Sequence, residues 1–98
     1  MRGRPRKTRI VQNEPRTKQF SPRGAIGRPS HNELKVEEVE AIRLSDFSGL
    51  SQMEAARSMG ISQQTFSRVL RNGRKRLAEA LVLGRIIKVK GGDFRIDR

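Results

Sequence analysis

Apolar residues recur at helical spacing through the middle of the chain, and this pattern predicts three helices. The first begins near Val36, where acidic side chains suit the positive end of a helix, and Gly49 ends it. The second runs over about 52–59 and the third over about 63–83, with Gly84 at its C-terminus. The buried face of the first helix is expected to contain Val36, Val39, Ile42 and Phe47.

The junction between the second and third helices has capping and turn residues at each required position. Ser51 and Glu54 are spaced as a capping box, Gly60 supplies the positive φ of a sharp turn, and Ser62 caps the next helix. We therefore predict a helix-turn-helix whose third helix has a core side and a nucleic-acid side. The core side is Phe66, Val69, Leu70, Gly73 and Leu77, and the opposite arc holds Gln64, Ser67, Arg68, Arg71 and Lys75, with Gln63 and Arg74 on its flank.

The two ends of the chain have different patterns from the middle. All four prolines lie in residues 1–35, so continuous helix is not expected there, although Arg9–Val11 suits a short strand. After the third helix, apolar and polar residues alternate on both sides of Gly91-Gly92-Asp93, which predicts a β-hairpin carrying Ile87, Val89, Phe94 and Ile96. Because an isolated hairpin is marginally stable, its apolar face should pack on the helices or pair with Arg9–Val11.

The predicted fold is therefore mainly α: a three-helix helix-turn-helix domain with a basic N-terminal arm and a small C-terminal β-hairpin. The expected division is a Pro/Gly-rich arm over 1–35, the helix-turn-helix domain over 36–84 and the hairpin tail over 85–98.

Composition narrows the function more than the fold. Of the 98 residues, 34% are hydrophobic and 33% charged, so the core is too small to surround a deep enzyme cleft, and we expect no enzyme and no cofactor. The net charge of +12 predicts a polyanionic partner. The charge is unevenly distributed along the chain. Residues 1–30 contain nine Lys or Arg and one acid, Glu14; residues 31–62 contain three Lys or Arg and six acids; and residues 63–98 contain ten Lys or Arg and three acids. A single basic face is therefore expected.

Several classes of site and location are not expected from this sequence. The chain has no cysteine, which excludes disulfides and thiol catalysis, and the lone His31 has no neighbouring ligands, so no metal site is predicted. No apolar run approaches a membrane span, and no apolar segment of a signal peptide follows the basic N-terminus. Cytoplasmic residence without membrane contact is the expectation.

Two sets of residues in the third helix are candidates for contact with double-stranded DNA. Base edges are expected to be contacted by the N-terminal residues of a helix that lies in the major groove. Glutamine can pair with adenine and arginine with guanine, whereas later cations are better placed for phosphates. The alternative for the later set is a solvated basic face. The predicted base-reading residues are Gln63, Gln64, Ser67 and Arg68, and the predicted phosphate-binding residues are Arg71, Arg74, Lys75 and Arg76.

The N-terminal arm adds a second candidate contact. The run Arg2-Gly3-Arg4-Pro5-Arg6-Lys7 resembles an AT-hook, whose extended backbone lies in the narrow minor groove of A·T tracts. The alternative is unspecific phosphate binding. Arg2, Arg4, Arg6 and Lys7 are thus candidates for minor-groove or phosphate contact.

The sequence also resembles a known family along nearly its whole length. The segments 39–44, 49–56 and 59–66 match the pattern of the small prokaryotic proteins grouped as domain of unknown function 134, as do Gly3-Arg4-Pro5-Arg6-Lys7 and Gly91-Gly92. The resemblance implies a DNA-binding protein whose helix-turn-helix is similar to region four of sigma factors. Many members carry cysteines in the N-terminal arm, where this chain has Thr8 and Gln12, so no metal site is carried over.

The resulting hypothesis is a sequence-specific DNA-binding protein that acts as a transcriptional regulator and reads the major groove with helix 63–83. One alternative is a nucleoid- or RNA-associated binder without sequence preference. Another is a sigma-like adaptor that contacts RNA polymerase. We also expect a homodimer, formed through Ala80–Leu83 and the predicted hairpin, because a single module reads few base pairs.

Overall fold

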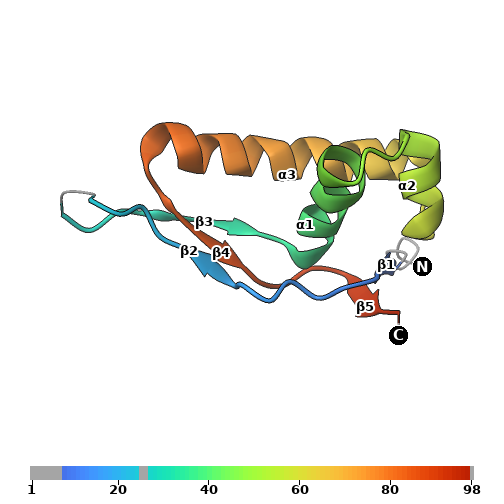
Figure 1. The fold of residues 1–98 in the computed structure, drawn as a ribbon, viewed down its shortest axis with the longest axis horizontal. Helices are drawn as coiled ribbons and strands as arrows, with labels where there is room; N and C mark the ends of the chain where they lie inside the picture. Colours follow the sequence, from blue (N-terminus) through green and yellow to red (C-terminus); the bar gives the residue numbers. More distant parts are fainter. Residues whose placement is uncertain (1–7, 25–26, 98) are drawn as a thin grey trace, which may run out of the picture.

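Three α-helices and five short strands make up the fold in the computed structural model, which describes residues 8–24 and 27–97. The long helix α3 lies across the molecule, with α1 and α2 packed around its N-terminal half and a sheet under its C-terminal half (Figure 1). In chain order the elements are β1 (Arg9–Val11), β2 (Gln19–Phe20), β3 (His31–Leu34), α1 (Val36–Ile42), the π-helical turn η1 (Arg43–Phe47), α2 (Gln52–Ser58), α3 (Gln63–Leu83), β4 (Ile86–Val89) and β5 (Phe94–Ile96).

The helices follow the sequence pattern except at the end of the first. Helix α3 has the predicted bounds, with Gly84 in the left-handed conformation at its C-cap, and α2 ends one residue earlier than predicted. After α1 the backbone widens into η1, where the Ser48 amide donates to the Arg43 carbonyl at 2.7 Å. A π-turn contains one extra residue, so it rotates the residues that follow it around the helix axis.

This rotation makes one predicted core position wrong. Phe47 is 85% exposed, although a regular helix would place it on the buried face with Val36. Leu44 points inward instead and is 3% exposed. A period of 3.6 residues, applied across a π-turn, therefore assigns Phe47 to the wrong side.

The main hydrophobic cluster lies where the three helices meet. Phe66 and Met59 are fully buried at its centre, and the small side chains of Ala55 and Ala56 allow α2 to pack closely on α3. The predicted core side of α3 is confirmed for Phe66, Val69 and Leu70. The cluster comprises Ala41, Leu44, Ala55, Ala56, Met59, Ile61, Phe66, Val69 and Leu70.

The predicted C-terminal hairpin is wrong, because its two strands belong to different sheets. Strand β4 lies between β2 and β3, antiparallel to the first and parallel to the second, whereas β5 pairs in parallel with β1. The connecting segment is bound to α1 and does not fold back on itself. The Val36 amide donates to the Gly91 carbonyl at 3.2 Å, and the Asp93 amide donates to the Glu37 carboxylate at 3.0 Å.

Strand β1, near the start of the chain, pairs with β5, near its end. The predicted pairing of the tail with Arg9–Val11 is confirmed, in the register Arg9 with Phe94 and Val11 with Ile96. Residues 9–34, which the sequence suggests are an arm, instead contribute β1, β2 and β3. A second hydrophobic cluster joins strands β1, β4 and β5 to α1; it comprises Val11, Val36 and Val89, with Val39, Ile87, Phe94 and Ile96 packed against it.

Candidate nucleic-acid interface

A capping box fixes the start of α2. The Glu54 amide donates to Ser51 Oγ at 3.1 Å, and the Ser51 amide donates to Glu54 Oε1 at 3.0 Å. The hydrogen bond from the Ser51 backbone lowers the pKa of the Glu54 carboxyl below its ordinary value. The capping box predicted from the sequence is therefore confirmed.

The turn between α2 and α3 is a Schellman motif closed by Gly60. The Gly60 amide donates to the Arg57 carbonyl at 3.1 Å, and the Ile61 amide donates to the Ala56 carbonyl at 3.0 Å. Gly60 has φ 66°, which a side chain would strain. Ser62 Oγ then accepts from the Thr65 amide at 3.1 Å and begins α3. The direction of α3 relative to α2 is thus set by local hydrogen bonds.

Strand β1 supports this turn from outside. The Ile10 amide donates to the Met59 carbonyl at 3.0 Å, and a Cβ added at Gly60 would lie 3.1 Å from Ile10 Cδ1. Strand β1 is therefore hydrogen-bonded to the turn that sets the direction of α3. The arm residues Arg2, Arg4, Arg6 and Lys7 lie outside the described residues, but they precede β1 by only a few positions.

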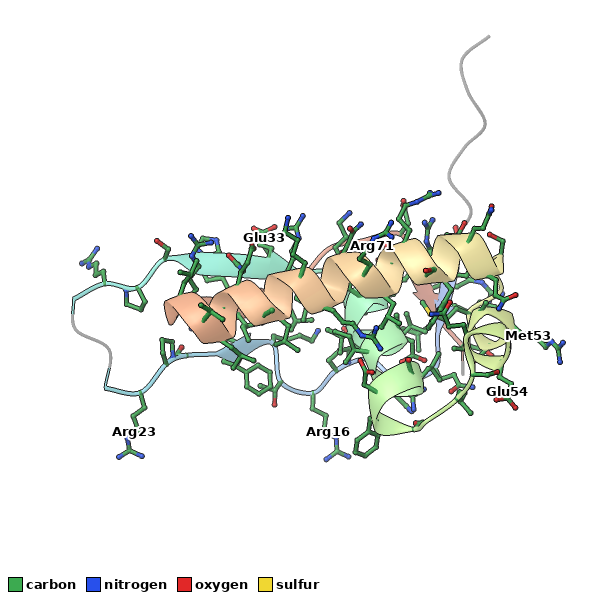
Figure 2. All side chains as sticks on the ribbon, turned by 90° about the horizontal axis from the view of Figure 1, so that it is seen from above. Arg16, Arg23, Glu33, Met53, Glu54 and Arg71 are labelled. Carbon is green, nitrogen blue, oxygen red and sulfur yellow. The ribbon has the colours of Figure 1, made fainter. Side chains whose placement is uncertain are left out.

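The exposed face of α3 carries a row of polar and cationic side chains. Gln64, Arg68, Arg71 and Lys75 are exposed and follow one another at steps of four, three and four residues, so they share the side opposite Phe66. Arg71 is labelled on α3 in the view from above (Figure 2). We call these four residues the α3 row.

The other predicted contact residues lie elsewhere on the helix. Gln63 is exposed beside the row, and Ser67 is half-buried. Arg74 donates two hydrogen bonds to Asp46 of η1, from Nη2 to Oδ1 at 2.7 Å and from Nε to Oδ2 at 3.1 Å. Its guanidinium lowers the pKa of the Asp46 carboxyl, whereas the same hydrogen bonds raise the pKa of Arg74. Arg76 is exposed and points to the β3 side, 3.5 Å from the Glu33 carbonyl.

A polar cleft of about 510 Å³ lies between β1, α1 and the first turns of α3. Arg68 of the α3 row lines it, together with Arg9 and Lys35. Arg9 is 8% exposed, although it occurs in a short basic segment that gives no indication of burial. Sequence reasoning missed this cleft because its walls come from segments that are distant in the chain. Glu37, Glu38, Ile61, Ser62, Thr65, Val69 and Asn72 complete its lining.

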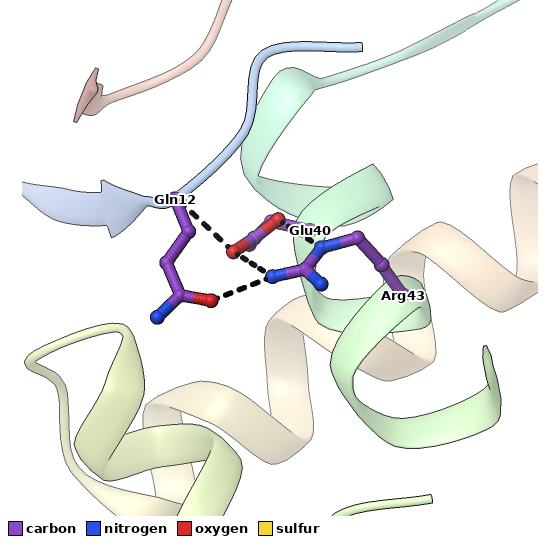
Figure 3. A network of polar contacts seen from close by, with 3 residues as sticks. All are labelled: Gln12, Glu40 and Arg43. Carbon is purple, nitrogen blue, oxygen red and sulfur yellow. Dashed lines mark hydrogen bonds and ion pairs between the residues drawn. The ribbon is translucent and has the colours of Figure 1, made fainter. Parts of the chain in front are cut away.

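Glu40 of α1 is a buried carboxylate that forms a polar network with Gln12 and Arg43 (Figure 3). Glu40 is 2% exposed, and its two oxygens each accept a hydrogen bond from Arg43 at 2.9 Å. The backbone amide of Gln12 also donates to Glu40 Oε2 at 3.1 Å, and Arg43 donates to the side-chain oxygen of Gln12 at 2.8 Å. The hydrogen bonds to Glu40 raise the pKa of Arg43. This network joins the end of β1 to α1, and local helix propensity could not predict it.

The described residues show few features of other kinds of site. His31 is exposed on β3, and within residues 8–24 and 27–97 we find no group of three or more metal-binding side chains. Among the helices in these ranges, each is too short or too polar to cross a bilayer.

Comparison with known proteins assigns the chain to a family. Residues 1–97 match the model described as protein of unknown function DUF134. The chain belongs to this family. A relative named UPF0251 protein in Halothermothrix orenii is 44% identical, over 96% of this chain and 70% of the relative. A UPF0251 protein of Caldicellulosiruptor saccharolyticus is 46% identical, over 93% of this chain and 64% of the relative.

A third UPF0251 protein, from Methanothermobacter thermautotrophicus, is 47% identical over 97% of this chain but only 50% of the relative. The chain therefore spans between half and seven-tenths of the length of these three relatives. The chain matches no solved structure.

Proposed function

We propose that this DUF134 protein is a sequence-specific double-stranded DNA-binding protein that regulates transcription by placing α3 in the major groove. The observation that carries the proposal is the α3 row, which lies on a helix whose opposite side is the hydrophobic core. The major groove accommodates an α-helix, and α3 begins at a fixed turn; these two facts support the proposal that α2, the Schellman turn and α3 act as a helix-turn-helix.

The order of residue types along the row supports a division of roles. Gln64 and Arg68 lie in the first two turns, where such helices contact base edges, and their side chains suit adenine and guanine. Gln63 and Ser67 flank them and supply secondary contacts. Arg71 and Lys75 lie further along and suit phosphates.

The position of β1 gives the basic arm a place in the same complex. Because the Ile10 amide is hydrogen-bonded to the α2–α3 turn, the described part of the chain begins near the helix proposed to enter the groove, and the basic residues 1–7 precede it in the sequence. Seven extended residues span at most about 25 Å, which is enough to cross one DNA backbone. We propose that Arg2, Arg4, Arg6 and Lys7 contact the adjacent minor groove or its phosphates.

The test compares affinities for a selected duplex and for random duplexes. A preferred site is first selected from random sequences, and binding of both DNAs is then measured at several salt concentrations. Arg68→Ala or Gln64→Ala should lose about 1–3 kcal/mol on the selected site only. Lys75→Ala should weaken both DNAs and reduce the salt slope by about one unit. Deletion of residues 1–7 should make that slope shallower by several units.

Arg95→Ala provides the matched control, because it also removes one exposed cation but lies on β5, away from α3. It should leave both affinities nearly unchanged. If the Gln64 and Arg68 variants retain the ratio of specific to random affinity, α3 does not read bases. The net charge of +12 would then favour a nucleoid- or RNA-associated binder.

A second candidate function is a sigma-like adaptor that contacts RNA polymerase. The observation in its favour is the pair of exposed apolar side chains Phe47 and Met53, which are 85% and 57% exposed and lie on or beside α2. Capture of RNA polymerase that survives nuclease treatment and is lost in Phe47→Ala would support this function.

A further inference from the structure

The C-terminal half of α3 lies over an apolar groove. The groove has a volume of about 420 Å³ and opens between α3, β2 and β4, with Phe20 and Ile87 in its wall. The same two side chains also line a neighbouring hollow of about 220 Å³, so the two depressions adjoin. Pro15, Arg16, Thr17, Leu34, Val39, Ile42, Leu77 and Val89 complete the groove, and Ser21, Pro22, Ala80, Leu81, Gly84 and Arg85 complete the hollow.

Beside these depressions, the last turn of α3 is apolar on its outer side. Leu81, Val82 and Leu83 are 75%, 81% and 59% exposed. Three consecutive helical residues point in three directions, so an amphipathic pattern does not account for them. Phe20, 54% exposed, adds to this surface. Leu81 and Phe20 both line the hollow, so the last turn of α3 and β2 share an exposed apolar patch, and such patches often mark interaction sites.

From this arrangement we infer that a second copy of the chain covers the patch, with the Leu81–Leu83 turn of each protomer packed against the Phe20 hollow of the other. A twofold interface must be self-complementary, because the same surface meets itself. Here a protruding apolar turn and an apolar depression adjoin on one surface. A twofold rotation can therefore place each turn opposite the other protomer's depression.

The distribution of charge along α3 is compatible with this pairing. The residues from Ala80 to Gly84 are uncharged, although a third of the chain is charged. Lys75, the cation of the α3 row nearest to the patch, is seven residues from Val82 and hence about 10 Å along the helix axis. This distance is slightly longer than the Debye length of about 8 Å at physiological salt, so repulsion between the α3 rows is partly screened at the patch.

The geometry also suits DNA with two half-sites, although the dimer itself does not depend on the proposed function. Two α3 helices that meet at their C-terminal ends have N-terminal ends at most about 60 Å apart. Half-sites one turn of DNA apart need about 34 Å, which corresponds to an angle of about 70° between the helices. A dimer through the far end of α3 therefore leaves both α3 rows free.

Sedimentation equilibrium of the full chain without DNA tests the inference. At tens of micromolar we expect twice the monomer mass of 11.1 kDa. Leu81→Glu places two carboxylates in the interface, because Leu81 lines the hollow and is 75% exposed, and should weaken association by at least tenfold. Phe47→Glu is the matched control, because it introduces the same charge at an equally exposed apolar residue outside the patch, and it should remain dimeric. Thermal unfolding of both variants establishes that they fold.

Other outcomes would overturn the inference. A wild-type chain that is a strict monomer at these concentrations, or a Leu81→Glu variant that is folded and fully dimeric, excludes this interface. Binding of the apolar anionic dye 8-anilinonaphthalene-1-sulfonate tests whether a small molecule, and not a second copy of the chain, occupies the groove. A monomer that binds the dye at the groove, with binding lost in Phe20→Ala, would show that the groove is a small-molecule site. Because DNA is absent, failure of this test leaves the proposed function unaffected.

Discussion

Replacement of Gly73 by alanine tests how closely α1 crosses α3. Glycine in the middle of a helix costs about 1 kcal/mol relative to alanine, so on propensity alone the substitution should stabilise the protein. However, a Cβ at this position would lie 3.0 Å from Glu38 Cβ, 3.3 Å from Ile42 Cδ1 and 3.4 Å from the Glu38 carbonyl oxygen. Carbon atoms pack best at about 3.5–4.0 Å, so α1 must move.

The two effects have opposite signs and known sizes. Overpacking of a close contact costs about 1–3 kcal/mol, which exceeds the gain of about 1 kcal/mol in helix propensity. Glu38 cannot easily move away from the added Cβ, because it is 4% exposed and its side chain accepts a hydrogen bond from the Lys35 backbone amide at 2.9 Å. We therefore expect Gly73→Ala to lower the free energy of unfolding by about 1 kcal/mol. Gly73→Val, which is larger and β-branched, should lower it by at least about 3 kcal/mol.

Urea unfolding followed by far-ultraviolet circular dichroism measures both variants. Asn72→Ala is the matched control, since Asn72 is the preceding residue on α3 and is exposed. Its replacement should raise the stability by about 0.5 kcal/mol through helix propensity alone. If Gly73→Ala raises the unfolding midpoint as much as Asn72→Ala, the crossing of α1 over α3 does not require glycine and the reasoning is refuted.

Two further predictions concern the core and the η1–α3 ion pair. Phe66→Ala should cost about 3–5 kcal/mol in the same unfolding assay, because the side chain is fully buried at the centre of the helical cluster; a loss below about 1 kcal/mol would contradict this. The hydrogen bond from Arg74 lowers the pKa of Asp46 below its ordinary 3.8, so the pair stabilises the fold above that pH and the contribution is lost as the pH falls through the lowered value. The stability difference between the wild type and Asp46→Asn should thus be constant near neutral pH and shrink below about pH 4, and a difference independent of pH would exclude the pair.

Sequence reasoning succeeded where a short segment determines its own structure. The bounds of α3, the Ser51–Glu54 capping box and the turn at Gly60 all depend on residues within a few positions of one another. Burial of Phe66 follows from the same local period. Each of these features depends on residues that are close together in the sequence, and each was predicted.

Sequence reasoning failed where partners are distant in the chain. The segment around Gly91-Gly92 looks like a hairpin turn, yet its backbone bonds to α1, more than fifty residues earlier. Arg74 looks like a free cation, yet it binds Asp46 across a separation of 28 residues. Phe47 was misplaced for a different reason, because the π-turn changes the helical period within five residues. Neither long-range pairing nor a change of period is encoded in apolar spacing.

The length of α3 explains why a helical module needs strands from both ends of the chain. With 21 residues α3 is about 31 Å long, whereas α1 and α2 have seven residues each and cover only its N-terminal half. Strands β2, β4 and β3 lie under the other half, and β1 fixes the α2–α3 turn through Ile10. An isolated 36–84 segment would lose both supports. In the proposed DNA complex, the segment first interpreted as an arm is therefore part of the structure that aims the α3 row, in addition to any contact it makes itself.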